Sequence, residues 1–111
     1  MKTNYDLGGG LVVVMTDVDP AAEDEYQAWY NEEHFPERAA IDGVLWGQRY
    51  RLVSGDGERY LALFGLRDVS VLESEQYTSL PVSPRTQSLI PSLRAFTRGV
   101  YEFLPPSTFA K

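Results

Sequence analysis

The only histidine of this 111-residue chain, His34, is the residue best suited to proton transfer. Imidazole is the side chain whose ordinary pKa lies close to neutral pH. His34 follows three ring side chains at helical spacing, Tyr26, Trp29 and Tyr30, and stands two residues before Pro36. A histidine in such surroundings can act as a general acid or base, and one at a helix end can equally cap terminal carbonyls. Both roles stay open for His34.

A carboxylate beside the imidazole would make the catalytic role more effective. Bonded to one ring nitrogen, it fixes the tautomer and stabilises the cation that forms when the other nitrogen takes a proton. The neighbours in sequence that could do this are Asn31, Glu32, Glu33 and Glu37. Glu33 falls on the same helical stripe as Tyr26 and Trp29, so we predict that it faces inward and orients His34.

Arginines on predicted strands are candidates for binding an anion, because long cations on strands usually reach an edge, a carboxylate or a ligand. Arg49 and the Tyr50 hydroxyl together could hold a carboxylate or enolate oxygen, although Arg49 could equally pair with a helix glutamate. Trp46, on the same strand, is expected in the core or in a cavity wall. The predicted catalytic residues are therefore His34, Glu33, Arg49 and Tyr50. The predicted substrate-binding residues are Tyr26, Trp29, Tyr30, Trp46 and Arg98.

The elements that must position these residues alternate as β-α-β-β-α-β. Asp19-Pro20 begins the first helix as a cap followed by a proline at the first helical position, and Pro36 marks either a separate turn or a kinked continuation. Strands are predicted at 11–16, 44–53, 59–66 and 96–104, helices at 20–33 and 70–80, and an irregular helical stretch at 83–95. This order predicts an α+β, ferredoxin-like fold with a four-stranded antiparallel sheet and two helices on one face.

The chain has the length of one domain, predicted at 11–104 between a flexible lead at 1–10 and a tail at 105–111. Two helices cover only one face of such a sheet. The first predicted strand is nevertheless apolar in both phases, and the third nearly so. An antiparallel sheet with one wet face should alternate instead. We therefore expect a homodimer formed through the open sheet face.

The amino-acid composition limits the classes of partner and cofactor that the chain is expected to bind. The formal net charge is −6, so nucleic acid and anionic membrane surfaces are not expected to bind. The chain has no cysteine, which removes disulfides, cysteine-bound zinc and thiol nucleophiles. No metal site or cofactor motif is recognised, and no cofactor is expected. Neither a signal peptide nor an apolar run of about 20 residues is present, so we expect a cytoplasmic protein.

The sequence resembles the EthD-type proteins of the dimeric α+β barrel superfamily. The matching residues are Tyr26, Trp29, Tyr30, His34 and Pro36, then Gly43-Val44-Leu45 and Arg49-Tyr50. The segment 96–102 is also similar to bacterial members, whereas Asp42 stands where the family usually has proline. The resemblance implies a ferredoxin-like protomer whose sheet packs against its mate. It also implies a ring-lined pocket between sheet and helices, with His34 as the family's histidine.

That superfamily includes cofactor-independent monooxygenases, polyketide cyclases, dehydratases and lactone isomerases, so the fold does not give the reaction. Our first hypothesis is a cofactor-independent enzyme of the isomerase, dehydratase, cyclase or lyase type. It would use His34 as acid or base on an apolar aromatic or polyketide-like molecule. The alternative is a non-catalytic small-molecule binding protein or an accessory subunit of a biosynthetic or catabolic pathway. A cofactor-free monooxygenase or a haem-binding protein is the third possibility.

Overall fold

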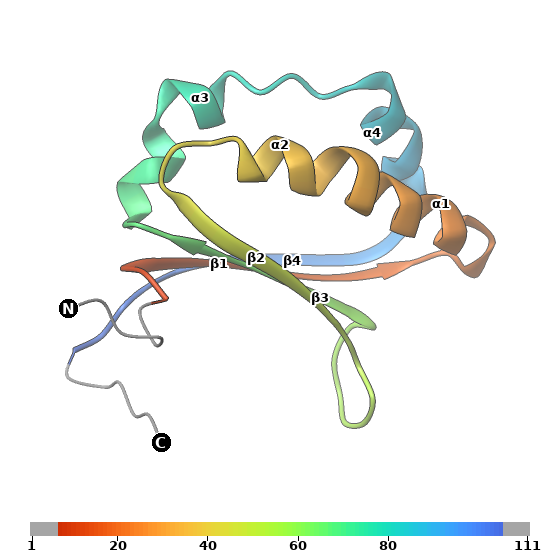
Figure 1. Ribbon diagram of the computed structural model, residues 1–111. Helices are drawn as coiled ribbons and strands as arrows, with labels where there is room; N and C mark the ends of the chain where they lie inside the picture. Colours follow the sequence, from red (N-terminus) through yellow and green to blue (C-terminus); the bar gives the residue numbers. More distant parts are fainter. Residues whose placement is uncertain (1–6, 106–111) are drawn as a thin grey trace.

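A single antiparallel sheet carries helical segments across one of its faces (Figure 1). The computed structural model describes residues 7–105, so most of the predicted lead and tail lies outside the described residues. The strands are β1 (Gly10–Val18), β2 (Val44–Arg51), β3 (Tyr60–Leu66) and β4 (Leu93–Glu102). Their order across the sheet is β2-β3-β1-β4, with β1 and β3 in the centre. This confirms the α+β, ferredoxin-like fold predicted from the order of elements.

The first helical segment continues through Pro36. It consists of η1 (Pro20–Ala22), α1 (Glu23–Trp29), η2 (Tyr30–His34) and α2 (Phe35–Ala39). The η2 segment is a π-helical turn, in which the Phe35 N–H bonds the carbonyl of Tyr30, five residues earlier. Pro36 is the second residue of α2, which begins directly after this wide turn, so its missing N–H falls in a first helical turn and does not end the segment. The kinked continuation is therefore the observed alternative, and the helix extends beyond its predicted end at residue 33.

The second helical region is broken into short turns, so the predicted single helix at 70–80 is wrong. Its pieces are η3 (Val69–Glu73), α3 (Glu75–Thr78), α4 (Pro84–Leu89) and η4 (Ile90–Ser92). Ser74 is extended, at φ −68° and ψ 152°, and its side chain accepts a hydrogen bond from the Tyr77 N–H as the cap of α3. Ser83 caps α4 in the same way through the Thr86 N–H. Serine caps and prolines thus favour several short helices over one long one.

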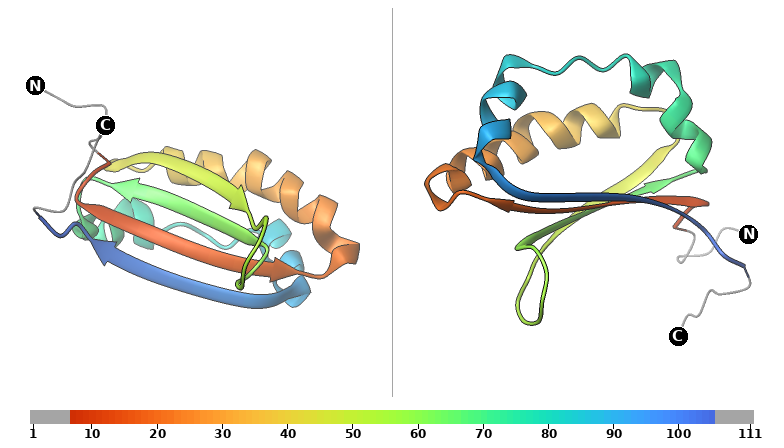
Figure 2. Two further views of the ribbon diagram at one scale, coloured as in Figure 1. Left: turned by 90° about the horizontal axis from the view of Figure 1, so that it is seen from below. Right: turned by 180° about the vertical axis from the view of Figure 1, so that it is seen from behind.

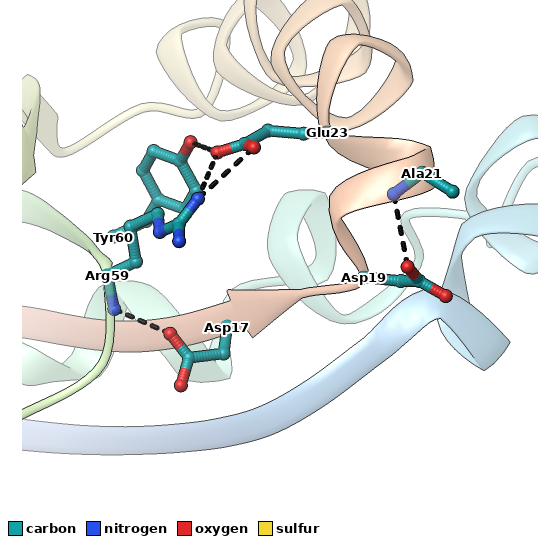
Figure 3. Close-up of polar contacts among 6 residues, drawn as sticks. All are labelled: Asp17, Asp19, Ala21, Glu23, Arg59 and Tyr60. Atoms are coloured by element: carbon teal, nitrogen blue, oxygen red, sulfur yellow. Dashed lines mark hydrogen bonds and ion pairs between the residues drawn. The ribbon is translucent and has the colours of Figure 1, made fainter.

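Polar contacts fix the start of α1 on the sheet (Figure 3). Glu23, the first residue of α1, accepts hydrogen bonds from Arg59 Nη1 at 2.9 Å and from the Tyr60 hydroxyl. The Arg59 backbone N–H in turn donates to Asp17 Oδ1 at 2.6 Å, near the end of β1. Because the Arg59 side chain is half exposed, the ion pair contributes little stability and serves chiefly to set the position of the helix.

The opposite face of the sheet is left uncovered by the described helices (Figure 2). Register assigns Val13 and Leu63 to this face as a cross-strand pair, because their neighbours Val12 and Phe64 are buried in the core. Trp46 pairs with Gly65 and lies on the same open face. Its indole N–H donates to the Leu7 carbonyl at 3.0 Å. The open face is therefore largely apolar, as the sequence predicted.

Candidate functional site

A cavity of about 310 Å³ lies between the sheet and the helical layer. Its volume is at the lower end of the range for small-molecule sites. The walls are mostly apolar and come from both layers, with Val12, Val14, Phe64, Leu72, Leu80 and Leu89 among them. Polar side chains enter the cavity at only a few points: Thr16, His34, Glu37, Arg38, Tyr77, Thr86 and Arg98. An apolar hollow with a few polar groups is the usual form of a site for a small molecule.

His34 lines this cavity from the end of the π-helical turn. Its ring stacks on the indole of Trp29 at 4.6 Å between centroids and meets Tyr30 edge-on at 4.9 Å. Burial lowers the pKa of His34 to about 4, and the positive charge of Arg38 adds to this effect while Glu33 opposes it. The imidazole is therefore neutral at pH 7 and has a nitrogen lone pair available to accept a proton.

The three aromatic residues predicted to bind substrate all line the cavity: Tyr26, Trp29 and Tyr30. Tyr26 and Tyr30 are buried, and their rings meet edge-to-face at 5.5 Å between centroids. Burial raises the pKa of both hydroxyls, so both stay protonated across the physiological range. The helical stripe read from the sequence is thus a continuous wall of rings beside His34.

Glu33 has partners other than His34. Its carboxylate accepts hydrogen bonds from the Trp29 indole N–H at 3.0 Å, from Ser83 Oγ at 2.7 Å and from Thr86 Oγ1 at 3.0 Å. The Ser83 bond is the main reason that the pKa of Glu33 lies below its ordinary value. No hydrogen bond found in residues 7–105 joins Glu33 to His34. Glu33 therefore fixes the indole on which His34 stacks, and it ties the first helical segment to α4.

Arg49 and Tyr50 do not form the predicted anion-binding pair. Consecutive strand residues point to opposite faces of a sheet. Arg49 faces the helices, with its guanidinium carbon 4.2 Å from the Tyr30 ring centroid. Tyr50 lies on the open face, is 48% exposed and donates to Gln48 Oε1 at 2.7 Å. Neither residue lines the cavity, and the four ion pairs found in residues 7–105 do not include Arg49.

Trp46 is likewise separated from the cavity, because it lies on the open face of the sheet. Its strand shifts register between Val44 and Trp46, and its cross-strand partner there is Gly65. A Cβ atom built on Gly65 would lie 2.0 Å from the indole nitrogen of Trp46, so the ring packs directly on the glycine backbone. Trp46 is thus a packing residue of the open face, on the other side of the sheet from His34.

Arg98, which the sequence predicted to bind substrate, lines the cavity, as do two residues that the sequence interpretation missed, Arg38 and Tyr77. Arg98 Nη2 donates to the Tyr77 hydroxyl at 2.8 Å. The guanidinium carbon of Arg38 lies 5.5 Å from the centroid of the same ring. Arg38 follows His34 by four residues, a spacing that places both on one side of a helix, so the sequence did carry a signal for it. Tyr77 carried no such signal.

Neither a metal centre nor a membrane span is found in the part of the chain that the structure describes. Residues 7–105 contain no group of three or more histidine, cysteine, aspartate or glutamate side chains placed to hold a metal ion. No helix in that range is long and apolar enough to cross a bilayer.

Comparison with known proteins identifies the fold. No family model and no curated protein sequence matches the chain. An ethyl tert-butyl ether D (EthD) family protein from Bacillus halodurans is 13% identical, with a TM-score of 0.58 over 86% of this chain and 99% of that one. An uncharacterised NIPSNAP-like domain protein from Burkholderia xenovorans is 15% identical, with a TM-score of 0.62 over 92% and 90% of the two chains.

A third similar structure is that of SnoaB, a cofactor-independent oxygenase from Streptomyces nogalater, in a mutant form. It is 15% identical to this chain, with a TM-score of 0.60 over 92% of this chain and 97% of that one. Identities this low establish a shared fold, and a shared fold does not by itself carry an activity. The chain therefore shares its ferredoxin-like α+β fold with an EthD family protein, a NIPSNAP-like protein and SnoaB, and this is the fold predicted from its sequence.

Proposed function

We propose that the protein is a small cofactor-independent enzyme that binds an apolar aromatic or polyketide-like molecule and uses His34 to move a proton. One observation carries the proposal: the single imidazole of the chain is neutral and opens into a ring-lined cavity of about 310 Å³. A neutral imidazole can remove a proton from a carbon between two carbonyl groups, or from an acidic hydroxyl.

The electrostatics of the cavity favour substrates that become anionic when they lose the proton. Before reaction, burial and the charge of Arg38 disfavour the imidazolium form of His34. Proton transfer from carbon to the imidazole nitrogen creates an imidazolium and an enolate together, so each charge stabilises the other. Return of the same proton to a different atom of the enolate completes an isomerisation. Loss of hydroxide from the neighbouring carbon, with protonation by the imidazolium, completes a dehydration.

The proposal is tested by exchange of the central C–H of benzoylacetone, a flat apolar 1,3-diketone, in D₂O. Proton NMR should show that the wild-type protein accelerates the exchange. His34→Gln should lose about 100-fold or more of this acceleration, because a general base contributes 10² to 10⁴. Tyr50→Phe, on the opposite face of the sheet, should keep it. Full acceleration by folded His34→Gln would contradict the role of His34.

A non-catalytic small-molecule binding protein is the second candidate. The observation that favours it is the packing of the imidazole, which stacks on one ring and meets Tyr30 and Phe64 edge-on. Such packing suits a fixed hydrogen-bond acceptor as well as a base. Saturable binding of benzoylacetone, with an exchange rate equal to that in buffer, would select this candidate over the enzyme.

We also propose that the protein assembles as a homodimer through the open face of its sheet. The proposal is supported by the apolar residues of that face, including Val13, Leu63 and Trp46, which no described helix covers. Contiguous apolar faces of this kind are rare in soluble monomers. The cavity opens on the helical side of the sheet, so the proposed dimer contact and the proposed site occupy different layers.

A further inference from the structure

Two arginines line the cavity without an acidic partner: Arg38 is partly buried, and Arg98 is exposed. In residues 7–105 the four ion pairs engage Arg59, Arg67, Arg85 and Arg94. Arg38 and Arg98 take part in none of them, although the chain has 16 acidic residues against 10 basic ones. Glu37 lines the same cavity, yet it belongs to none of these pairs either. Cations that line an apolar hollow without a carboxylate partner favour an anionic ligand.

One tyrosine holds both arginines on the same side of the cavity. Tyr77 accepts a hydrogen bond from Arg98 Nη2 at 2.8 Å, and its ring lies 5.5 Å from the guanidinium carbon of Arg38. The three residues come from α2, α3 and β4, so the arrangement is a product of the tertiary fold. Two guanidinium groups near one ring repel each other, and an anion between them relieves that repulsion.

The remainder of the cavity defines the rest of the ligand. The other lining residues include the rings of Trp29, Tyr30 and Phe64 together with aliphatic side chains. Such walls favour a flat apolar body of modest size. The described residues add no helix N-terminus to the two arginines, as phosphate sites often do, because α3 has only four residues.

We propose that Arg38 and Arg98, held together by Tyr77, form an anion site that binds the carboxylate of an aromatic carboxylic acid whose ring lies against Trp29. The inference rests on the proposed function in using the same cavity, and it adds the substrate class, an apolar ring bearing one carboxylate. The carboxylate would also partly offset the positive charge that Arg38 exerts on His34, and so make proton uptake by His34 easier.

The test compares two probes of nearly the same shape, the anion 1-naphthoate and its neutral amide 1-naphthamide, by isothermal titration calorimetry at low salt. The wild-type protein should bind the carboxylate about 10-fold or more tightly than the amide, as charge-assisted hydrogen bonds to guanidinium groups require. Arg38→Gln and Arg98→Gln should each weaken naphthoate binding by about 10-fold and change naphthamide binding by less than about twofold.

Two further variants serve as controls for loss of a surface arginine and for loss of folding. Arg67→Gln removes an exposed arginine that does not line the cavity, and it should leave both affinities unchanged. Arg98→Lys keeps the charge and should retain part of the naphthoate affinity, which separates loss of charge from loss of fold. Equal affinities for the two probes, equal losses for both in the glutamine variants, or no binding of either probe would overturn the anion site.

The anion site and the proposed catalysis fail separately. Selective naphthoate binding that depends on Arg38 and Arg98, with no exchange of benzoylacetone, would leave the anion site standing and remove the role of His34 as a base. Catalysed exchange that depends on His34, with no preference for naphthoate over naphthamide, would do the reverse.

Discussion

At the scale of single residues, the state of His34 is set by desolvation more than by any one partner. Burial is the main cause of its lowered pKa, and the charge of Arg38 comes second. Glu33 pulls in the opposite direction, but its carboxylate is held by Trp29, Ser83 and Thr86. The net result is a base that is always available at neutral pH but becomes strong only when an anion forms or binds beside it.

This state predicts a pH dependence of stability. The pKa of His34 is about 4 in the folded protein against 6.5 for the ordinary group. Between these values the unfolded chain binds a proton that the folded chain does not, so stability is lost as pH falls through that window. The free energy of unfolding should therefore fall by roughly 2 kcal/mol from pH 7.5 to pH 5 on account of this residue.

Urea unfolding of wild type and His34→Gln at the two pH values isolates the effect, because carboxylates contribute alike in both proteins. The variant should show a smaller loss of stability at pH 5 than the wild type. Identical pH dependence in the two proteins would mean that His34 titrates normally and is well hydrated.

At the scale of elements, the features set by local periodicity could be predicted from the sequence. Those set by contacts between segments far apart in the chain could not. The stripe of Tyr26, Trp29 and Tyr30 was predictable because one helix places such residues on one side. The π-helical turn could not be predicted. It depends on a backbone hydrogen bond between residues five apart in the chain, which no residue type marks in the sequence.

Arg49 and Tyr50 were paired because they are neighbours in sequence, whereas alternation along a strand sends neighbours to opposite faces. For Trp46, the irregular register between β2 and β3 removes the simple phase from which a face could be assigned. Tyr77, Ser83 and Thr86 reach the site only through packing of the second helical region on the first, which no local pattern encodes.

Gly43, in the turn between α2 and β2, is predicted not to tolerate a side chain. Gly43 has φ +92°, and a Cβ atom there would lie 2.5 Å from Cγ2 of Val71, which is buried. Gly43→Ala should therefore combine backbone strain with overpacking and lower the free energy of unfolding by about 2 to 4 kcal/mol. Urea denaturation measures this directly.

Gly55→Ala is the matched control. Gly55 has a similar φ of +98°, but nothing lies within 4 Å of its added Cβ atom. It should cost only the strain, about 1 to 2 kcal/mol. If both variants lost the same free energy of unfolding, the side chain of Val71 would have moved aside without loss of stability, and the overpacking argument would be wrong.

At the scale of the whole molecule, the proposed binding site and the proposed dimer contact lie on opposite faces of the sheet. Residues of the helical layer and inner side chains of the sheet line the cavity. The helices cover one face of the sheet and leave the other open for the proposed partner (Figure 2). Because alternate residues of each strand serve the two faces, substitution on one face can be made without entering the other. Assembly and ligand binding are therefore expected to respond to different residues.

Leu63→Lys tests this division, since Leu63 lies on a central strand and pairs with Val13 across the open face. A charge there cannot be buried in an apolar contact without a partner. The wild-type protein should have twice the 12.5 kDa chain mass in light scattering after gel filtration, and the variant should have the mass of one chain. Val82→Lys, at an exposed position of the helical layer, should stay dimeric.

The monomeric Leu63→Lys variant should still bind naphthoate, because the cavity is on the other side of the sheet. A wild-type protein that already has the mass of one chain would contradict the dimer, and loss of naphthoate binding in a folded Leu63→Lys monomer would show that the two faces are coupled.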